Sequence, residues 1–400
     1  MASERLYDLA GRYKKTKLWN KVFEDQLFAV RLADGEIGYC SVMGIAREHI
    51  AISMYIGAKG LTSLWRLYDS PIEMTGAFPL DERMLMQDCL QCSFERKDLL
   101  LREELAEARQ YAKAHGFAYR GRNAFPRFIK YQPFRFPWPV TQADEDNMCR
   151  MLSAAIEVAD KLTHSKAREL GFSQIQAGKY IPLLEYDGTA FVWDTTKLPE
   201  PLEQTNPSPK LDEFTAARLR NERRQGILAC KLTRVFQPSQ AENGEAPYFP
   251  ITALCLYDDG VLMPGKLIRD YENKPVQALT RFAQGLLEEG CMPAIIQVCD
   301  DRTEAFLRQF CEQIGIMLQR RQELPELEEL EMEMQQQMLD SGPLAEETEM
   351  LDEMLTMLMQ MDDQEIATIP NAVRDGLMEM KRAGVLPEAV ANRLTDVFGD

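Results

Sequence analysis

Residues 227–321 constrain the fold most strongly, because short apolar runs typical of β-strands alternate there with helical patterns. The seven expected elements are strands at 227–236, 251–259 and 261–268, a helix at 274–290, a strand at 293–298, a helix at 301–315 and a strand at 316–321. Helices that alternate with buried strands indicate an α/β domain. A further helical pattern follows the last of these strands.

Three strands followed by a helix, a strand, a helix and a strand is also the element order of a ribonuclease-H-like domain. That fold often hosts phosphoryl transfer by two Mg²⁺ ions, which several carboxylates hold about 4 Å apart. One carboxylate normally stands on the first strand, where this chain carries Lys231, Thr233 and Arg234 and no acid. A fold alone does not confer activity, and here the first strand lacks the acid that would hold a metal ion. We therefore favour a domain without a metal site and expect no cofactor.

Six carboxylates elsewhere in this domain keep a second hypothesis open, a carboxylate- and metal-dependent phosphodiesterase. They are Asp258, Asp259, Glu288, Glu289, Asp300 and Asp301, and the metal candidates among them are Asp258, Glu289, Asp300 and Asp301. At least three would have to converge on one ion. Structural roles explain them as well, since the Asp pairs suit a hairpin turn and a helix cap, and the Glu pair ends a helix.

Residues 113–140 combine six basic residues with eight aromatic ones and contain no acid. Cations beside exposed rings are typical of single-stranded nucleic acid sites, where charge binds phosphate and rings stack on bases. The candidate contacts are Arg120, Arg122, Arg127, Lys130, Arg135, Tyr119 and Trp138. Four prolines in the stretch instead favour an extended connector whose rings and arginines pack against a neighbouring core. One exposed face of cations would support nucleic acid binding, and cations held in ion pairs would argue against it.

The first 170 residues predict an α+β domain. The expected elements are helices at 3–17, 61–68, 96–115 and 142–167 and strands at 27–32, 37–44 and 50–57. Asp34-Gly35 and Asp187-Gly188 are typical of tight hairpin turns. The glycines around the first strands have neither the spacing nor the lysine of a phosphate-binding loop, so we assign them to turns and strand ends.

Nine cysteines include one C-x-x-C pair, Cys89 and Cys92, and the three histidines are scattered along the chain. A structural zinc site needs four ligands, usually from two such pairs or from one pair and two histidines. We therefore interpret Cys89 and Cys92 as small apolar residues of a packed segment rather than as a metal or redox site. The sequence also lacks the catalytic patterns G-x-S-x-G and H-E-x-x-H.

The end of the sequence is acidic and rich in methionine. Fifteen acidic and no basic residues lie between Gln322 and Glu365, so most of the net charge of −17 comes from this segment. A helical tail is expected, with an apolar stripe made of Leu351, Met354, Leu355, Leu358 and Met361. The stripe suits an unknown protein partner, self-association through the C-terminal helices, or a contact that covers the core of the chain's own body. Partner capture by the intact chain and by a chain ending near Gln337 would isolate the contribution of the tail.

These patterns divide the chain into four parts. They are an α+β domain at 1–170, a hairpin, linker and helix at 171–225, an α/β domain at 226–338 and an acidic helical tail at 339–400. The first residues lack the apolar run of a secretory signal, and no stretch approaches the roughly 18 apolar residues of a membrane-spanning helix. We therefore expect a cytoplasmic protein with no membrane partner.

Two parts of the chain resemble domains of uncharacterised bacterial proteins. The phrases DQLFAVRLADGEIGYCSVMG and GFAYRGRNAFPRFIKYQPFRFPWP are similar to the N-terminal domain of such proteins, and YFPITALCLYDDGVLMPGKLI is similar to the domain that follows it. Both are domains of unknown function, so the resemblance implies a bacterial two-domain protein and supplies no catalytic residues. The leading hypothesis is a non-catalytic interaction or regulatory protein, with nucleic acid binding and phosphodiester hydrolysis as alternatives.

Overall fold

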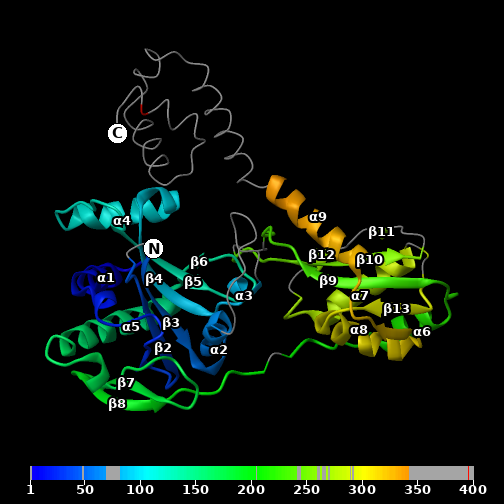
Figure 1. Ribbon diagram of the computed structural model, residues 1–400. Coiled ribbons are helices and arrows are strands. Elements are labelled where there is room, and N and C mark those ends of the chain that lie inside the picture. Colours follow the sequence, from blue (N-terminus) through cyan, green and yellow to red (C-terminus); the bar gives the residue numbers. More distant parts are fainter. Residues whose placement is uncertain are drawn as a thin grey trace, which may run out of the picture. The chain divides into compact units, whose positions relative to one another are not determined.

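The computed structural model of the protein describes residues 2–46, 49–68, 82–203, 205–240, 245–258, 262–263, 267–268, 271–288, 290, 292–341 and 395. The chain forms two compact units, Met1–Leu324 and Pro325–Asp400. The first unit contains two β-sheets that do not share a hydrophobic core (Figure 1). The main described element of the second unit is helix α9 (Pro325–Ser341).

The first sheet has eight strands in the order β6-β5-β4-β3-β2-β1-β7-β8. Their bounds are β1 (Phe28–Arg31), β2 (Ile37–Met43), β3 (Ile50–Ile56), β4 (Cys89–Glu95), β5 (Phe125–Tyr131), β6 (Trp138–Pro139), β7 (Tyr180–Tyr186) and β8 (Phe191–Lys197). Neighbouring strands are antiparallel except for β1 and β7, which are parallel. The helices of this domain are α1 (Glu4–Thr16), α2 (Gly57–Tyr68), α3 (Glu82–Leu85), α4 (Arg102–Ala114) and α5 (Gln142–Lys161), with 3₁₀ turns η1 (Leu18–Asn20), η2 (Lys97–Leu99) and η3 (Ala167–Leu170).

Each face of the first sheet has a separate core, because successive side chains of a strand point to opposite faces. On one face, α1, α4 and α5 pack with alternate strand residues such as Cys40 and Ile52. On the other face, α2 contributes Leu61 to a core that includes Tyr39 and Tyr55. The sheet is therefore covered by helices on both sides (Figure 1).

The two tight turns expected from the Asp-Gly pairs are present, and both join strands of this sheet. Gly35 joins β1 to β2 with a φ of +90°, and the Glu36 N–H donates to the Asp34 carboxylate at 3.0 Å. Gly188 joins β7 to β8 with a φ of +106°, next to Asp187. Glycine adopts such positive φ values without the steric cost of a side chain, which explains why it stands at both turns.

The second sheet has the order β11-β10-β9-β13-β14, and β12 also pairs with β10. The bounds are β9 (Ile227–Arg234), β10 (Ile251–Tyr257), β11 (Leu262–Met263), β12 (Leu267–Ile268), β13 (Ile295–Val298) and β14 (Met317–Arg320), with α6 (Glu213–Arg220), α7 (Pro275–Glu288) and α8 (Asp301–Ile314) as the helices. The β9, β13 and β14 strands are parallel, whereas β9, β10 and β11 are antiparallel. Phe282, Phe306 and Phe310 fill the core between helices and sheet. This mixture of helices with a mixed sheet agrees with the expected α/β class.

Several elements differ from the sequence-based expectation. The predicted connector at 113–140 contains β5, and Pro126 is the second residue of that strand. A proline is tolerated there because the outer neighbour, β6, pairs with β5 only at Ile129 and Lys130. The helix expected at 96–115 begins at Arg102, and the strand expected at 261–268 is replaced by β11 and β12. Most of the tail predicted at 339–400 lies outside the described residues.

Gly60 of α2 leaves no room for a side chain. A Cβ atom at this position would lie 3.0 Å from the backbone carbon of Tyr55 and 3.1 Å from the backbone oxygen of Asp88. We expect Gly60→Ala to lower the free energy of unfolding by about 1–3 kcal/mol, because the neighbouring backbone must move. Gly11 of α1 has open space around it, so Gly11→Ala should stabilise the protein by about 0.5–1 kcal/mol. Denaturant unfolding of both variants checks this, and equal effects would contradict it.

Candidate functional site

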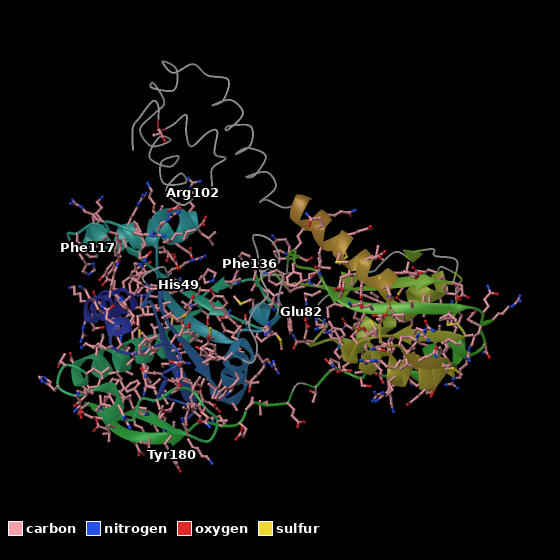
Figure 2. All side chains as sticks on the ribbon, viewed as in Figure 1. His49, Glu82, Arg102, Phe117, Phe136 and Tyr180 are labelled. Carbon is pink, nitrogen blue, oxygen red and sulfur yellow. The ribbon has the colours of Figure 1, made fainter. Side chains whose placement is uncertain are left out.

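The two sheets of the first unit are joined by a short stretch of backbone pairing. The Phe249 N–H donates to the Phe134 carbonyl at 2.9 Å, and the Phe136 N–H donates to the Pro247 carbonyl at 2.7 Å. Figure 2 labels Phe136 in this stretch, which lies between β5 and β6. The segment before β10 is thus bonded to the segment that follows β5.

Glu82, which Figure 2 labels, is the first residue of α3 and connects two arginines of the second domain. Its Oε1 atom accepts from Arg234 Nε at 3.2 Å and from Arg302 Nη1 at 2.9 Å, and its Oε2 atom accepts from Arg302 Nη2. Arg234 is at the end of β9 and Arg302 is in the first turn of α8. One carboxylate therefore bonds to the end of β9 and to the start of α8.

Arg234 is buried, with 2% of its surface exposed, and each of its guanidinium nitrogens has an acceptor. Nε donates to Glu82, Nη2 donates to Glu272, and Nη1 donates to the Phe249 carbonyl at 2.8 Å. A guanidinium stays charged at any pH that a folded protein survives, so its burial requires these partners. We call Glu82, Arg234, Glu272 and Arg302 the junction network.

Phe134 packs against Arg234 of the junction network. Its ring centroid lies 3.9 Å from the Arg234 guanidinium carbon, an arrangement that adds a cation–π interaction. Its φ is +59°, which an L-residue with a bulky side chain adopts only when surrounding contacts impose it. The contacts are two backbone hydrogen bonds, from the Phe134 N–H to the Leu85 carbonyl at 2.6 Å and from the Phe249 N–H.

The charges of the network reinforce one another. Burial alone would raise the pKa of Glu82, but hydrogen bonds and charge from Arg302 and Arg234 outweigh it and hold that pKa below its ordinary value. Burial lowers the pKa of Arg302, and the bonded Glu82 carboxylate more than restores it. Both groups are therefore charged at neutral pH.

A pocket of about 530 Å³ lies beside the network. One side of it is the polar face of α2, where Lys59, Thr62, Ser63 and Arg66 follow one another at i, i+3, i+4 and i+7. The remaining lining is given by Met86, Asp88, residues 132–135, residues 202–203 and 205–207, Tyr271, Glu272, Asn273 and Arg302. Both domains of the first unit thus contribute side chains to one concave site.

The polar groups of this junction pocket differ in how firmly they are held. The Thr62 hydroxyl accepts from the Leu202 N–H at 2.9 Å, and the Ser63 hydroxyl accepts from the Asp88 N–H at 3.0 Å, so these two atoms fix the pocket wall. Lys59 is 79% exposed and lies 3.8 Å from Asp88, whose pKa is raised by burial. The Tyr271 hydroxyl is buried and has no hydrogen-bond partner among the residues that the structure describes.

The basic residues predicted to bind nucleic acid do not gather on one exposed face. Arg127 is paired with Glu104 at 3.1 Å, Lys130 is paired with Asp144 at 2.8 Å, and Arg135 donates to the Ala246 carbonyl at 3.0 Å. Arg120 and Arg122 are exposed, Tyr119 is half-buried against Phe125, and Trp138 is half-buried in β6. This pairing is the arrangement that argues against the nucleic acid hypothesis, which remains a prediction.

Each described carboxylate that was predicted to bind metal contacts a different protein group. Asp258 accepts from the Ile227 N–H at 2.9 Å, Asp300 caps α8 through the Thr303 N–H at 2.8 Å, and Asp301 is paired with Arg320 at 2.9 Å. Within the described part of the chain, no three His, Cys, Asp or Glu side chains come close enough to hold a metal ion. Asp259 and Glu289 lie outside the described residues, and Glu288 ends α7.

Two further sets of predicted residues concern the cysteines and the tail. Cys89 and Cys92 are both buried in β4, as expected for packed residues, and they belong to the cores on opposite faces of the sheet. Burial raises the pKa of Cys89 to about 12, which suppresses the thiolate form. The stripe of Leu351, Met354, Leu355, Leu358 and Met361 lies outside the described residues.

Sequence reasoning missed the junction pocket and its network. One signal was available, because polar Lys59, Thr62, Ser63 and Arg66 alternate with apolar residues at helical spacing. Nothing in the sequence pairs Glu82 with arginines that lie 152 and 220 positions further along the chain.

Comparison with protein families gives two matches. Residues 4–177 match the family described as Domain of unknown function (DUF7309). Residues 215–335 match the family described as Domain of unknown function (DUF6930). Two domains of unknown function therefore follow one another along the chain, as the resemblance noted in the sequence implied. No curated protein matches the chain. Among the described residues, no helix combines the length and apolarity needed to cross a membrane.

Glu82 is the residue whose loss should disrupt the junction most. We expect Glu82→Gln to lower the free energy of unfolding by about 3 kcal/mol at neutral pH, because Arg234 loses a charged partner while it stays buried. The matched control is Glu213→Gln, since Glu213 is 78% exposed in its pair with Arg220 and should contribute less than about 0.5 kcal/mol.

The effect of Glu82→Gln should also depend on pH. The folded-state pKa of Glu82 is lowered, so its contribution is complete above the unfolded-state pKa and is lost as the pH falls through the folded-state value. Unfolding curves of the wild type and Glu82→Gln should therefore converge in acid. A difference that stays constant with pH would contradict the ionic role.

Proposed function

We propose that the protein is a non-catalytic regulatory protein that binds a small anionic molecule in the junction pocket. The observation that carries this proposal is the pocket itself, which four cations line from both domains. Its volume of about 530 Å³ is in the range of ligand sites, and ligand sites occur preferentially where domains meet. A cytoplasmic setting fits the free thiols of the described cysteines.

The charge distribution suggests which ligands would bind. Lys59 and Arg66 come from one face of α2, and Arg135 and Arg302 come from other walls of the pocket. Phosphate and carboxylate groups bind such sets of cations through charge-assisted hydrogen bonds. The lining acids Asp88, Glu203 and Glu272 would repel a bare anion, so a ligand that also carries hydroxyl or amino donors fits better. Nucleotides and phosphorylated sugars have this combination.

The position of the pocket supports a regulatory role. Arg302 and Glu272 belong both to its lining and to the junction network. A ligand that contacts them and α2 together binds best when the two domains are joined by the network. By linkage, the ligand would stabilise that joined state, and anything that opens the junction would weaken binding.

Two features of the second domain favour binding over catalysis. Its strand order, β11-β10-β9-β13-β14, supports the ribonuclease-H-like assignment as part of this proposal. In that assignment β9 is the first strand, and it carries Lys231 and Arg234 where metal-dependent members of the fold place an acid. Arg234 serves the junction network, and Asp258, Asp300 and Asp301 each bond to protein groups that stabilise the fold.

Binding can be tested by calorimetric titration of the full chain with AMP, inorganic pyrophosphate and citrate. We expect saturable binding of at least one probe, at least about tenfold weaker in Lys59→Ala/Arg66→Ala because two charge-assisted contacts are lost. Arg220→Ala, on the exposed side of α6, is the matched control and should bind normally. Failure of all three probes to bind, or equal binding by the folded double variant, would overturn the proposal.

The absence of catalysis has a separate test. We expect the full chain to leave single-stranded DNA and RNA intact in the presence of Mg²⁺ or Mn²⁺, because the described carboxylates are not gathered on one ion site. Gel assays with both metals check this. Cleavage that disappears in Asp300→Asn or Glu289→Gln would show that the phosphodiesterase alternative is right.

A further inference from the structure

The outer edge of the first sheet is unusually open. β8 extends over 7 residues, without a proline or a bulge, in continuous register with β7. The other edge strands are short, since β6 and β11 have 2 residues each and β14 has 4. Proteins normally protect sheet edges with short strands, prolines or bulges, because an unprotected edge pairs readily with another strand. Among the described strands, β8 alone lacks these protections.

The hydrogen bonds of the β7–β8 hairpin show which backbone groups of β8 are not bonded to β7. The Asp187 N–H bonds to the Ala190 carbonyl at 3.1 Å, and the Leu198 N–H bonds to the Lys179 carbonyl at 2.8 Å. Bonded and non-bonded pairs alternate along an antiparallel ladder, so the N–H and C=O groups of the even-numbered residues of β8 point to β7. The N–H and C=O groups that point away from the sheet belong to Phe191, Trp193, Thr195 and Lys197.

The position of Pro182 agrees with this alternation. Pro182 has no N–H and stands opposite Thr195, at a pair that needs no hydrogen bond across β7 and β8. The Thr195 N–H therefore points to the open edge, where it donates to the Asp194 carboxylate at 2.8 Å. Pairing with a second strand replaces this bond, which is exposed to solvent. Three large side chains of the same hairpin are also exposed, Tyr180 at 65%, Val192 at 51% and Tyr186 at 46% (Figure 2 labels Tyr180).

We propose that β8 pairs with β8 of a second copy of this chain in an antiparallel, two-fold symmetric dimer. In such a dimer, residues whose N–H and C=O groups point away from β7 must stand opposite residues of the same kind. Pairing centred on Thr195 satisfies this condition. It places Lys197 opposite Trp193 of the second copy and Thr196 opposite Asp194. Pairing centred on Asp194 would instead set two carboxylates directly opposite each other, which is unfavourable.

Charge complementarity supports this register. Trp193 Nε1 lies 3.4 Å from Glu157 Oε1 of α5, so the ring and the carboxylate are adjacent on one face of β8. Lys197 is on the same face as Trp193, because both have odd numbers in one strand. In the dimer, Lys197 of each copy therefore reaches the ring and the carboxylate of the other. The contact occurs twice, because a two-fold axis relates the copies.

Sedimentation equilibrium of the full chain over micromolar concentrations tests the proposal. We expect a monomer–dimer equilibrium whose dissociation constant rises at least about tenfold in Thr195→Pro, because two hydrogen bonds across the axis are lost. Thr195→Ala keeps the N–H and should change the constant by less than about threefold. Lys197→Glu, which brings like charge to Glu157, should weaken the dimer as Thr195→Pro does.

A second measurement covers variants that fold poorly. Hydrogen exchange of the wild type should show Thr195 and Lys197 amides that become more protected as concentration rises, whereas the Thr196 amide, bonded to β7, should not change. A wild type that stays monomeric, or a dimer that survives both Thr195→Pro and Lys197→Glu, overturns the proposal. Neither result bears on ligand binding, because the junction pocket contains no residue of β7 or β8.

Discussion

The buried guanidinium of Arg234 is the constraint on which the arrangement of the first unit depends. A permanently charged group that has left water must keep its hydrogen-bond acceptors, because an unpaired buried charge is far more costly than an exposed one. Its acceptors and its aromatic neighbour come from α3, from the segment after β5, from the segment before β10 and from the residues before α7. Four separate stretches must therefore be in place before Arg234 is satisfied.

This requirement explains two otherwise unfavourable features nearby. Phe134 has a positive φ, and its backbone bonds on both sides compensate for that conformation. Glu82 is largely buried at the start of a helix of only 4 residues, and two arginines compensate for its desolvation. Neither feature would persist alone, and each becomes stable because the other residues of the junction are fixed. Phe134, Glu272 and Arg302 also line the junction pocket, so the same contacts fix part of its shape.

Local patterns predicted much of the fold and little of the site. Strands that are nearly continuous buried runs, such as β2 and β3, and turns with Asp-Gly were recognisable because their signals lie within a few residues. β5 was obscured because Pro126, Arg127 and Lys130 interrupt its apolar run, and their partners belong to other elements. The junction network was out of reach of such reasoning, because it is defined by tertiary contacts between residues that have no local relation.

The placement of Cys89 and Cys92 has a practical consequence. A C-x-x-C pair on a helix would put both sulfur atoms on one side, but on a strand the odd spacing sends them to opposite sides. Each thiol therefore lies in a different core, and the sheet separates the two. Chemical labelling of the two sulfurs would report independently on the loosening of the α1–α5 layer and of the α2 layer. The labelling rates of these two thiols would show which of the two helix layers of the N-terminal domain unfolds first.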